Sequence, residues 1–151
     1  DLHVRSRRQR QMCIRDSNYT YQFPGGHWRP SESLEESLKR EIKEETGIDS
    51  TLENGPFMVI EEYYDNYLDT GKTRCNKMYY YIVHCNDGPK VEEMSLSELE
   101  RETDFNLFYI PIKDMEQFLK ESMANNTVEE IIGTEMLSVM QEYKEKHVRR
   151  K

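Results

Sequence analysis

A helix whose two ends are both marked in the sequence constrains this chain more than any other feature. Ser33 and Glu36 form the Ser-x-x-Glu capping box that starts helices, and Gly47 is typical of the position just after a helix ends. Between them, apolar residues recur at helical spacing: Leu34, Leu38 and Ile42. The pattern predicts a helix over about residues 33–46, with one apolar side that faces the core.

The same helix carries carboxylates on its apolar side. With 3.6 residues per turn, Glu41 and Glu45 fall about 20° to either side of Leu34, and Glu44 lies beside them. Carboxylates turned toward a core are costly unless they are paired or bound to metal, and neighbouring ones repel each other. A hard divalent ion, Mg²⁺ or Mn²⁺, fits such a group. The alternative, a salt-bridged surface helix, suits the opposite side, which carries Glu35, Glu36, Lys39 and Lys43.

The spacing of residues 26–48 matches a known signature. Gly26 is followed by five residues, then Glu32, then seven residues, then the run Arg40-Glu41-Ile42-Lys43-Glu44-Glu45-Thr46-Gly47-Ile48. This resembles the Nudix hydrolase signature G-x5-E-x7-R-E-U-x-E-E-x-G-U, in which U is aliphatic, and all nine specified positions match. The preceding Phe23-Pro24-Gly25 is also common in that family.

The resemblance implies a fold and roles for individual residues. It implies an α/β fold, an α/β/α sandwich with a mixed sheet, in which this helix holds divalent ions that bind a diphosphate. Glu44 and Glu45 are then metal ligands, assisted by the backbone carbonyl of Gly25, and Glu41 is a further ligand or the group that handles the proton of the attacking water. Arg40 corresponds to an arginine that orients such a glutamate. The alternative interpretation of Arg40 is an ordinary surface arginine paired at i,i±4 with Glu36 or Glu44. Glu32 is expected to hold the loop to the helix.

The implied activity is metal-dependent hydrolysis of the pyrophosphate in a nucleoside diphosphate linked to another group. Some relatives take a base from a later loop, and the residues that could supply one here are Glu98, Glu100, Glu102 and Asp104. Aromatic side chains that could stack on a nucleobase are Trp28, Tyr63, Tyr64 and Tyr67, whereas Tyr79, Tyr80 and Tyr81 are expected in the core. The leading alternative is a Nudix-like module that senses a nucleotide without hydrolysing it. An isomerase of the same fold ranks third.

The remaining sequence alternates strand and helix patterns. Strands are expected at residues 19–23, 57–64, 77–84 and 104–110, with a long loop at 65–76 and an irregular stretch at 85–103. A helix is expected from Pro111 to about Met123, and a last helix after Thr127, where Thr-x-x-Glu repeats the capping box. Together these elements predict one domain over residues 18–151.

The first residues have a different character. Residues 1–17 contain five arginines and two aspartates, so the remaining 134 residues carry a net charge of −11 within a total of −8. Residues 12–17, MCIRDS, look like the translation of a sequencing-library adaptor. We therefore predict that residues 1–17 are non-native and that the first strands of the sheet are missing. The alternative is a genuine basic arm.

Composition excludes several classes of protein. The acidic balance argues against general nucleic-acid binding. The sequence shows no apolar run long enough for a membrane span and no secretory signal, so a cytoplasmic location is expected. Cys13, Cys75 and Cys85 lack C-x-x-C spacing, so no disulfide framework or zinc site is indicated. The expected partners are a nucleoside diphosphate derivative and, as an open alternative, a second copy of the chain.

Overall fold

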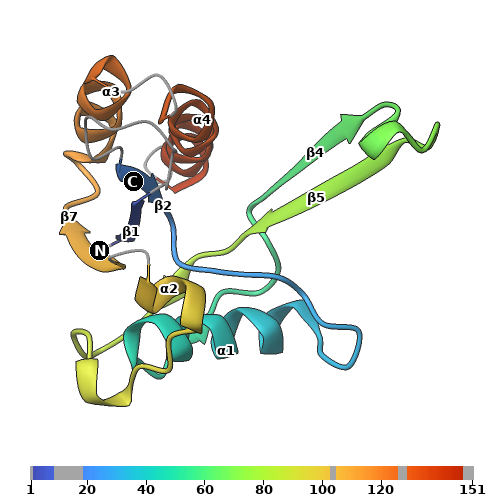
Figure 1. Cartoon of the computed structure of the whole chain (residues 1–151). Helices are drawn as coiled ribbons and strands as arrows, with labels where there is room; N and C mark the ends of the chain where they lie inside the picture. The colour runs from blue at the N-terminus through green and yellow to red at the C-terminus, as the bar shows by residue number, and fades with distance from the viewer. Residues whose placement is uncertain (1, 9–18, 103–104, 126–128, 148–151) are drawn as a thin grey trace.

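The computed structural model describes residues 2–8, 19–102, 105–125 and 129–147 (Figure 1). Its strands are β1 (Leu2–Arg8), β2 (Tyr19–Gln22), β3 (Thr51–Leu52), β4 (Met58–Tyr64), β5 (Arg74–Tyr80), β6 (Val83–His84) and β7 (Asn106–Ile110). Its α-helices are α1 (Leu34–Thr46), α2 (Glu98–Glu102), α3 (Met115–Asn125) and α4 (Glu129–His147), with short 3-10 helices η1 (Tyr67–Asp69) and η2 (Val91–Glu93). In Figure 1, α3 and α4 lie on one side of β1, β2 and β7, and α1 lies on the other.

Helix α1 has the two ends that the sequence predicts. The Ser33 hydroxyl accepts a hydrogen bond from the backbone N–H of Glu36 (3.1 Å), and the Glu36 carboxylate accepts one from the N–H of Ser33 (2.8 Å). These two bonds satisfy donors that the first turn of a helix leaves without partners. At the other end Gly47 adopts a left-handed φ of 70° and donates its N–H to the carbonyl of Lys43 (2.8 Å).

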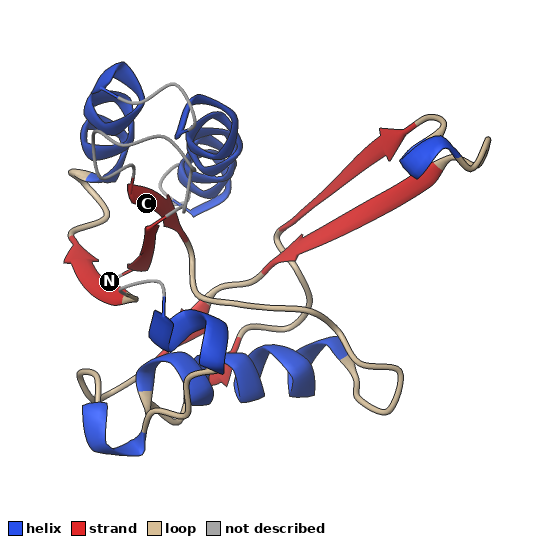
Figure 2. Ribbon diagram, viewed as in Figure 1, coloured by secondary structure: helices blue, strands red, loops and turns tan. Residues whose placement is uncertain are grey.

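The strands in the described part of the chain form three small antiparallel sheets (Figure 2). In the first, β1 lies between β2 and β7; the second pairs β3 with β6; the third is the long hairpin of β4 and β5. The α/β class is confirmed, but the prediction of one mixed sheet is wrong for the described residues, because every pairing among them is antiparallel. The hairpin satisfies its inner backbone groups locally, without the crossover connection that a parallel pair needs.

The main core lies under α3 and α4, which cover the β2-β1-β7 sheet. Met115, Leu119, Met136 and Met140 are buried there, and the Tyr21 ring of β2 meets Phe118 edge to face at 4.8 Å. Ile42 of α1 and Ile48, two residues beyond the end of that helix, are also buried, at 5% and 1% exposed. Leu34 and Leu38 are only half-buried, since they line the cavity described below. Among the described helices, none has the length and apolar character needed to cross a bilayer.

Several predicted boundaries move. The strand expected over 77–84 is split into β5 and β6, and β5 starts three residues earlier, at Arg74. The stretch 85–103, expected to be irregular, contains η2 and α2. Helix α3 starts at Met115 because residues 111–114 form a turn in which Asp114 donates its N–H to the Pro111 carbonyl (2.9 Å). The second capping box depends on Thr127, which lies outside the described residues.

Strand β1 falls within the segment that we predict to be non-native. It pairs with both β2 and β7 through backbone hydrogen bonds, so a strand does precede β2 in this structure. Any extended peptide can offer such backbone groups to a sheet edge. The assignment of residues 1–17 to an adaptor therefore stays a prediction.

Candidate active site

The loop before α1 is bound to the last turns of that helix through Glu45. The Glu45 side chain comes from the inward side of α1 and is 1% exposed, as the helical spacing predicts. Its carboxylate accepts a hydrogen bond from the backbone N–H of Gly25 at 3.0 Å. A hydrogen bond to a buried carboxylate offsets part of the cost of removing that charge from water. Gly25 and Glu45, both expected around the metal, are thus in direct contact.

Arg40 lies at the centre of a cluster of carboxylates. Its guanidinium donates to both oxygens of Glu32 (2.8 and 3.2 Å), to Glu41 (2.7 Å) and to Glu44 (3.2 Å). The hydrogen bond from Arg40 lowers the pKa of Glu32, and the same contact raises the pKa of Arg40. The sequence offered Glu36 or Glu44 as partners of Arg40. Glu44 is one of them, whereas Glu36 closes the capping box instead.

Ser37 and the carbonyl of His27 complete the surroundings of Arg40. The Arg40 Nη2 group donates to Ser37 Oγ (3.2 Å) and to the His27 carbonyl (3.3 Å), and Ser37 Oγ also donates to that carbonyl (3.3 Å). Ser37 is 4% exposed. Ser37 is not among the site residues predicted from the sequence. Its place one turn before Arg40, on the side of the helix that carries the carboxylates, does indicate that it can contact Arg40.

Gly26 is required by close packing. A Cβ atom at this position would lie 2.2 Å from Cδ of Glu41 and 2.3 Å from one of its oxygens. Any larger residue would therefore have to displace the Glu41 carboxylate. The loop and the helix approach each other this closely only because residue 26 has no side chain.

The donor set is suited to a divalent cation. Glu41, Glu44 and Glu45 carry carboxylates on neighbouring turns of α1, and the N–H of Gly25 is hydrogen-bonded to Glu45. Carboxylate and backbone carbonyl oxygens are the hard ligands that Mg²⁺ and Mn²⁺ prefer. Within the described part of the chain, no three acidic, histidine or cysteine side chains already converge on one metal position. Instead, Arg40 lies between Glu41 and Glu44 and supplies the positive charge.

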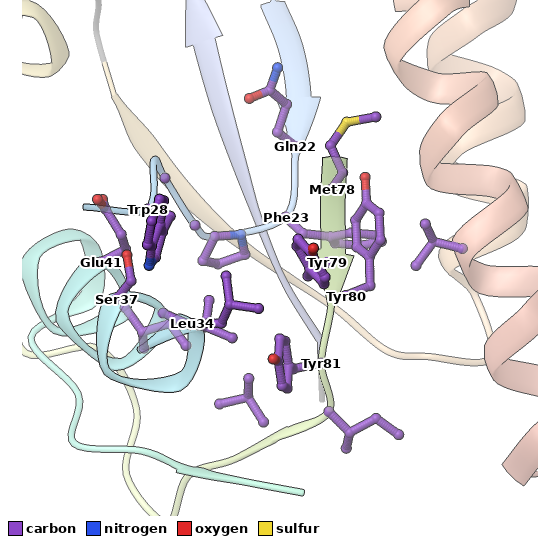
Figure 3. Close-up of a pocket in the computed structure, with 18 of the residues that line it drawn as sticks. Gln22, Phe23, Trp28, Leu34, Ser37, Glu41, Met78, Tyr79, Tyr80 and Tyr81 are labelled. Carbon is purple, nitrogen blue, oxygen red and sulfur yellow. The ribbon is translucent and has the colours of Figure 1, made fainter. Parts of the chain in front are cut away.

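A cavity of about 1250 Å³ opens beside this cluster (Figure 3). Trp28 and Glu41 lie on one side of it, and the end of β5 with Tyr79 and Tyr80 lies across from them. Gly25, Gly26 and Tyr81, the residue after β5, also line it. A further wall comes from α4 and includes Met136, Val139, Met140 and Tyr143. The cavity therefore joins an acidic end at α1 to a largely aromatic and apolar interior, the usual composition of a small-molecule site.

The other predicted site residues are distributed unevenly around this cavity. Trp28 lines it, is 54% exposed, and donates its indole N–H to the Glu32 carbonyl (2.7 Å). Tyr63 and Tyr64 lie exposed on the hairpin and do not line it. The α2 acids do not line it either: Glu98 and Glu102 are exposed and Glu100 is half-buried, and Asp104 lies outside the described residues. Tyr81 is buried as predicted, whereas Tyr79 is 39% exposed.

Comparison with known proteins identifies the domain. A family model described as the NUDIX domain matches residues 4–131, which is most of the chain. A search of curated proteins gives no match. The matched region contains the motif at residues 26–48, helix α1 and the cavity wall that they form. The chain therefore belongs to the Nudix domain family, whose members hydrolyse nucleoside diphosphate derivatives and generally use divalent cations.

Proposed function

We propose that this chain hydrolyses the pyrophosphate bond of a nucleoside diphosphate linked to another group, with Mg²⁺ or Mn²⁺ as the cofactor. The observation that carries the proposal is the position of Glu41. Its carboxylate lies in the cavity wall, against Gly26 and within hydrogen-bond distance of Arg40. An acid held at the edge of a substrate-sized cavity, on the helix that also carries Glu44 and Glu45, suits the binding of a cation and a diphosphate.

Glu44, Glu45 and the Gly25 carbonyl would hold the cation, and Glu41 would be a further ligand or would take the proton from the attacking water. A bound divalent cation neutralises phosphate oxygens and lowers the pKa of water. The protein's contribution is to fix these donors. Gly25 holds Glu45 from the loop side, and Arg40 holds Glu41 and Glu44 from the helix side. Glu32 in turn orients the guanidinium of Arg40 through two hydrogen bonds.

The nucleoside would lie in the aromatic part of the cavity. Trp28 presents an exposed indole at the same wall as Glu41, and its N–H is held by the Glu32 carbonyl. A fixed aromatic ring beside the acidic end can stack on a base while the diphosphate faces α1. Tyr79 also lines the cavity and is partly exposed, so it offers a second ring on the opposite wall.

A panel of nucleoside diphosphate derivatives, incubated with Mg²⁺ or Mn²⁺ and scored for phosphate-bearing products, tests the proposal. We expect hydrolysis that stops when the metal is chelated and that is lost in Glu41→Gln. Glu145→Gln is the matched control, because it makes the same change at an exposed residue of α4 that does not line the cavity. Nucleotide binding without turnover for the whole panel would overturn the proposal and favour a nucleotide-sensing module.

A further inference from the structure

The last turn of α1 is capped by a distant segment of the chain. The final carbonyls of a helix have no partners within the helix and need donors from elsewhere. Here the N–H of Lys90 donates to the Thr46 carbonyl (2.9 Å), and the N–H of Ser95 donates to the Glu44 carbonyl (2.7 Å). Residues 90–95, which contain η2, therefore bind the end of the helix that carries Glu44 and Glu45.

Lys43 fastens this segment to α1. Its ammonium group donates to Glu93 (2.6 Å), to Asp49 (3.2 Å) and to the Gly47 carbonyl (3.0 Å). All three acceptors lie beyond the end of α1, and Glu93 belongs to the capping segment. The hydrogen bond that Lys43 donates to Glu93 is the main reason that the pKa of Lys43 is raised. A cation at this end of a helix also interacts favourably with the helix dipole.

The packing leaves little freedom at this junction. A Cβ atom on Gly47 would lie 2.2 Å from the Lys90 carbonyl oxygen and 3.1 Å from Cβ of Glu93. The capping segment thus lies directly against the residue that ends α1. Glu44 is held on two sides, because its carboxylate contacts Arg40 and its carbonyl accepts from Ser95.

We infer that Lys43 is a positioning residue of the hydrolase: by binding Glu93 it keeps residues 90–95 on the end of α1 and so fixes the backbone of Glu44 for cation binding. The inference rests on the proposed function, because it takes Glu44 as a metal ligand. Lys43 does not line the cavity, so we assign it no direct contact with the substrate. Residues that orient a metal ligand through hydrogen bonds affect metal affinity even though they never touch the ion.

The test compares Lys43→Met and Glu93→Gln with Lys43→Arg, which keeps the charge and the donors. Lys39→Met is the matched control, since Lys39 is exposed on the same helix. In Lys43→Met and Glu93→Gln we expect the Mg²⁺ concentration for half-maximal hydrolysis to rise about two- to fivefold, the effect of losing one partly exposed ion pair, while kcat at saturating Mg²⁺ stays within about twofold. Lys43→Arg should restore the parent value. A general loss of folded protein would instead lower kcat at every Mg²⁺ concentration.

Two measurements do not depend on turnover. Amide hydrogen exchange at Ser95 and Lys90 should be about two- to fivefold faster in Lys43→Met than in Lys39→Met, because these N–H groups are the capping donors and the capping segment loses one partly exposed ion pair. Binding of Mn²⁺ alone, followed by electron paramagnetic resonance, should weaken in the same variants. Unchanged exchange, or unchanged Mn²⁺ affinity, in Lys43→Met overturns the inference. If the parent protein binds Mn²⁺ through this site but hydrolyses nothing, the proposed activity is wrong. The role of Lys43 is then decided by hydrogen exchange and Mn²⁺ affinity alone.

Discussion

The carboxylate of Glu45 accepts the backbone N–H of Gly25 at 3.0 Å, in a position where Glu45 is 1% exposed. This single contact joins the loop that lines the cavity to the inward side of α1. Glu41 and Glu44 differ from Glu45, because their carboxylates form ion pairs with Arg40. The three glutamates therefore stand in two different environments, and their substitutions should differ in effect.

Glu44→Gln and Glu45→Gln should both abolish metal-dependent hydrolysis, by about a hundredfold or more, because glutamine keeps the size of glutamate but removes the charged ligand. Their stabilities should differ. Glu44 is partly exposed, so Glu44→Gln should change the free energy of unfolding by no more than about 0.5 kcal/mol. Glu45→Gln weakens a buried charge-assisted hydrogen bond and should cost about 1–2 kcal/mol.

If the three carboxylates only repelled one another, as helical spacing alone would indicate, removing one charge would raise the stability of the metal-free protein. The contacts of Arg40 with Glu41 and Glu44 remove the basis for that gain. Thermal melts with and without Mg²⁺, run beside the hydrolysis assay, check both parts of the prediction. Variants that hydrolyse at the parent's rate would require the ligand assignment to be given up.

Gly26→Ala should reduce activity with little effect on stability. The added Cβ would overlap the Glu41 carboxylate, which is the flexible end of a side chain and can rotate away. Rotation would break the 2.7 Å contact with Arg40 and move the acid from its place in the cavity wall. Gly88→Ala is the control, because nothing lies within 4 Å of a Cβ there. A melting temperature lowered by many degrees, with normal turnover per folded molecule, would contradict this account of Gly26.

The pair of Glu32 and Arg40 should make stability depend on pH in a defined direction. The hydrogen bond from Arg40 lowers the pKa of Glu32 below its ordinary value of 4.5. A lowered pKa in the folded state means that the stabilisation is present above pH 4.5 and is lost as the pH falls through the lowered value. The parent should therefore melt at a higher temperature than Glu32→Gln at pH 7. This difference in melting temperature should shrink as the pH falls toward 3. A difference that stays constant over this range would show that the charge of Glu32 is not responsible.

Local signals in the sequence were enough to predict α1 and the inward direction of Glu45. Each end of the helix is set by two residues that lie within four positions of each other. The direction of a side chain follows from 3.6 residues per turn. The motif at residues 26–48 likewise identified the family, since its spacing lies within one continuous segment.

Contacts between distant segments were not predictable in the same way. Helical spacing predicts Glu36 or Glu44 as partners of Arg40. It cannot predict Glu32, which lies in the preceding loop, because its distance from Arg40 depends on how that loop turns. Residues 90–95 reach α1 across more than forty positions of chain, and no periodicity marks that contact. The division into three sheets also depends on which strands meet after folding, whereas the pattern of each strand is local.

The native gene should lack residues 1–17. The adaptor-like run at residues 12–17 and the change from a basic segment to an acidic domain support this prediction. Sequencing the locus in the source genome is the measurement. Finding the arginine-rich segment in frame there would show that it is native, and β1 would then be a native strand of the first sheet.

Gly47→Ala should be strongly destabilising for two separable reasons. Gly47 has a φ of +70°, which costs an alanine about 1 kcal/mol, and its new Cβ would lie 2.2 Å from the backbone carbonyl oxygen of Lys90. That oxygen cannot rotate away as a side chain can, so the capping segment must shift. Gly71→Ala separates the two effects, because Gly71 has a φ of +69° but open space around a Cβ. Urea unfolding should give a loss of about 1 kcal/mol for Gly71→Ala and about 3 kcal/mol or more for Gly47→Ala. Equal losses in the two variants would mean that residues 90–95 do not pack against the end of α1.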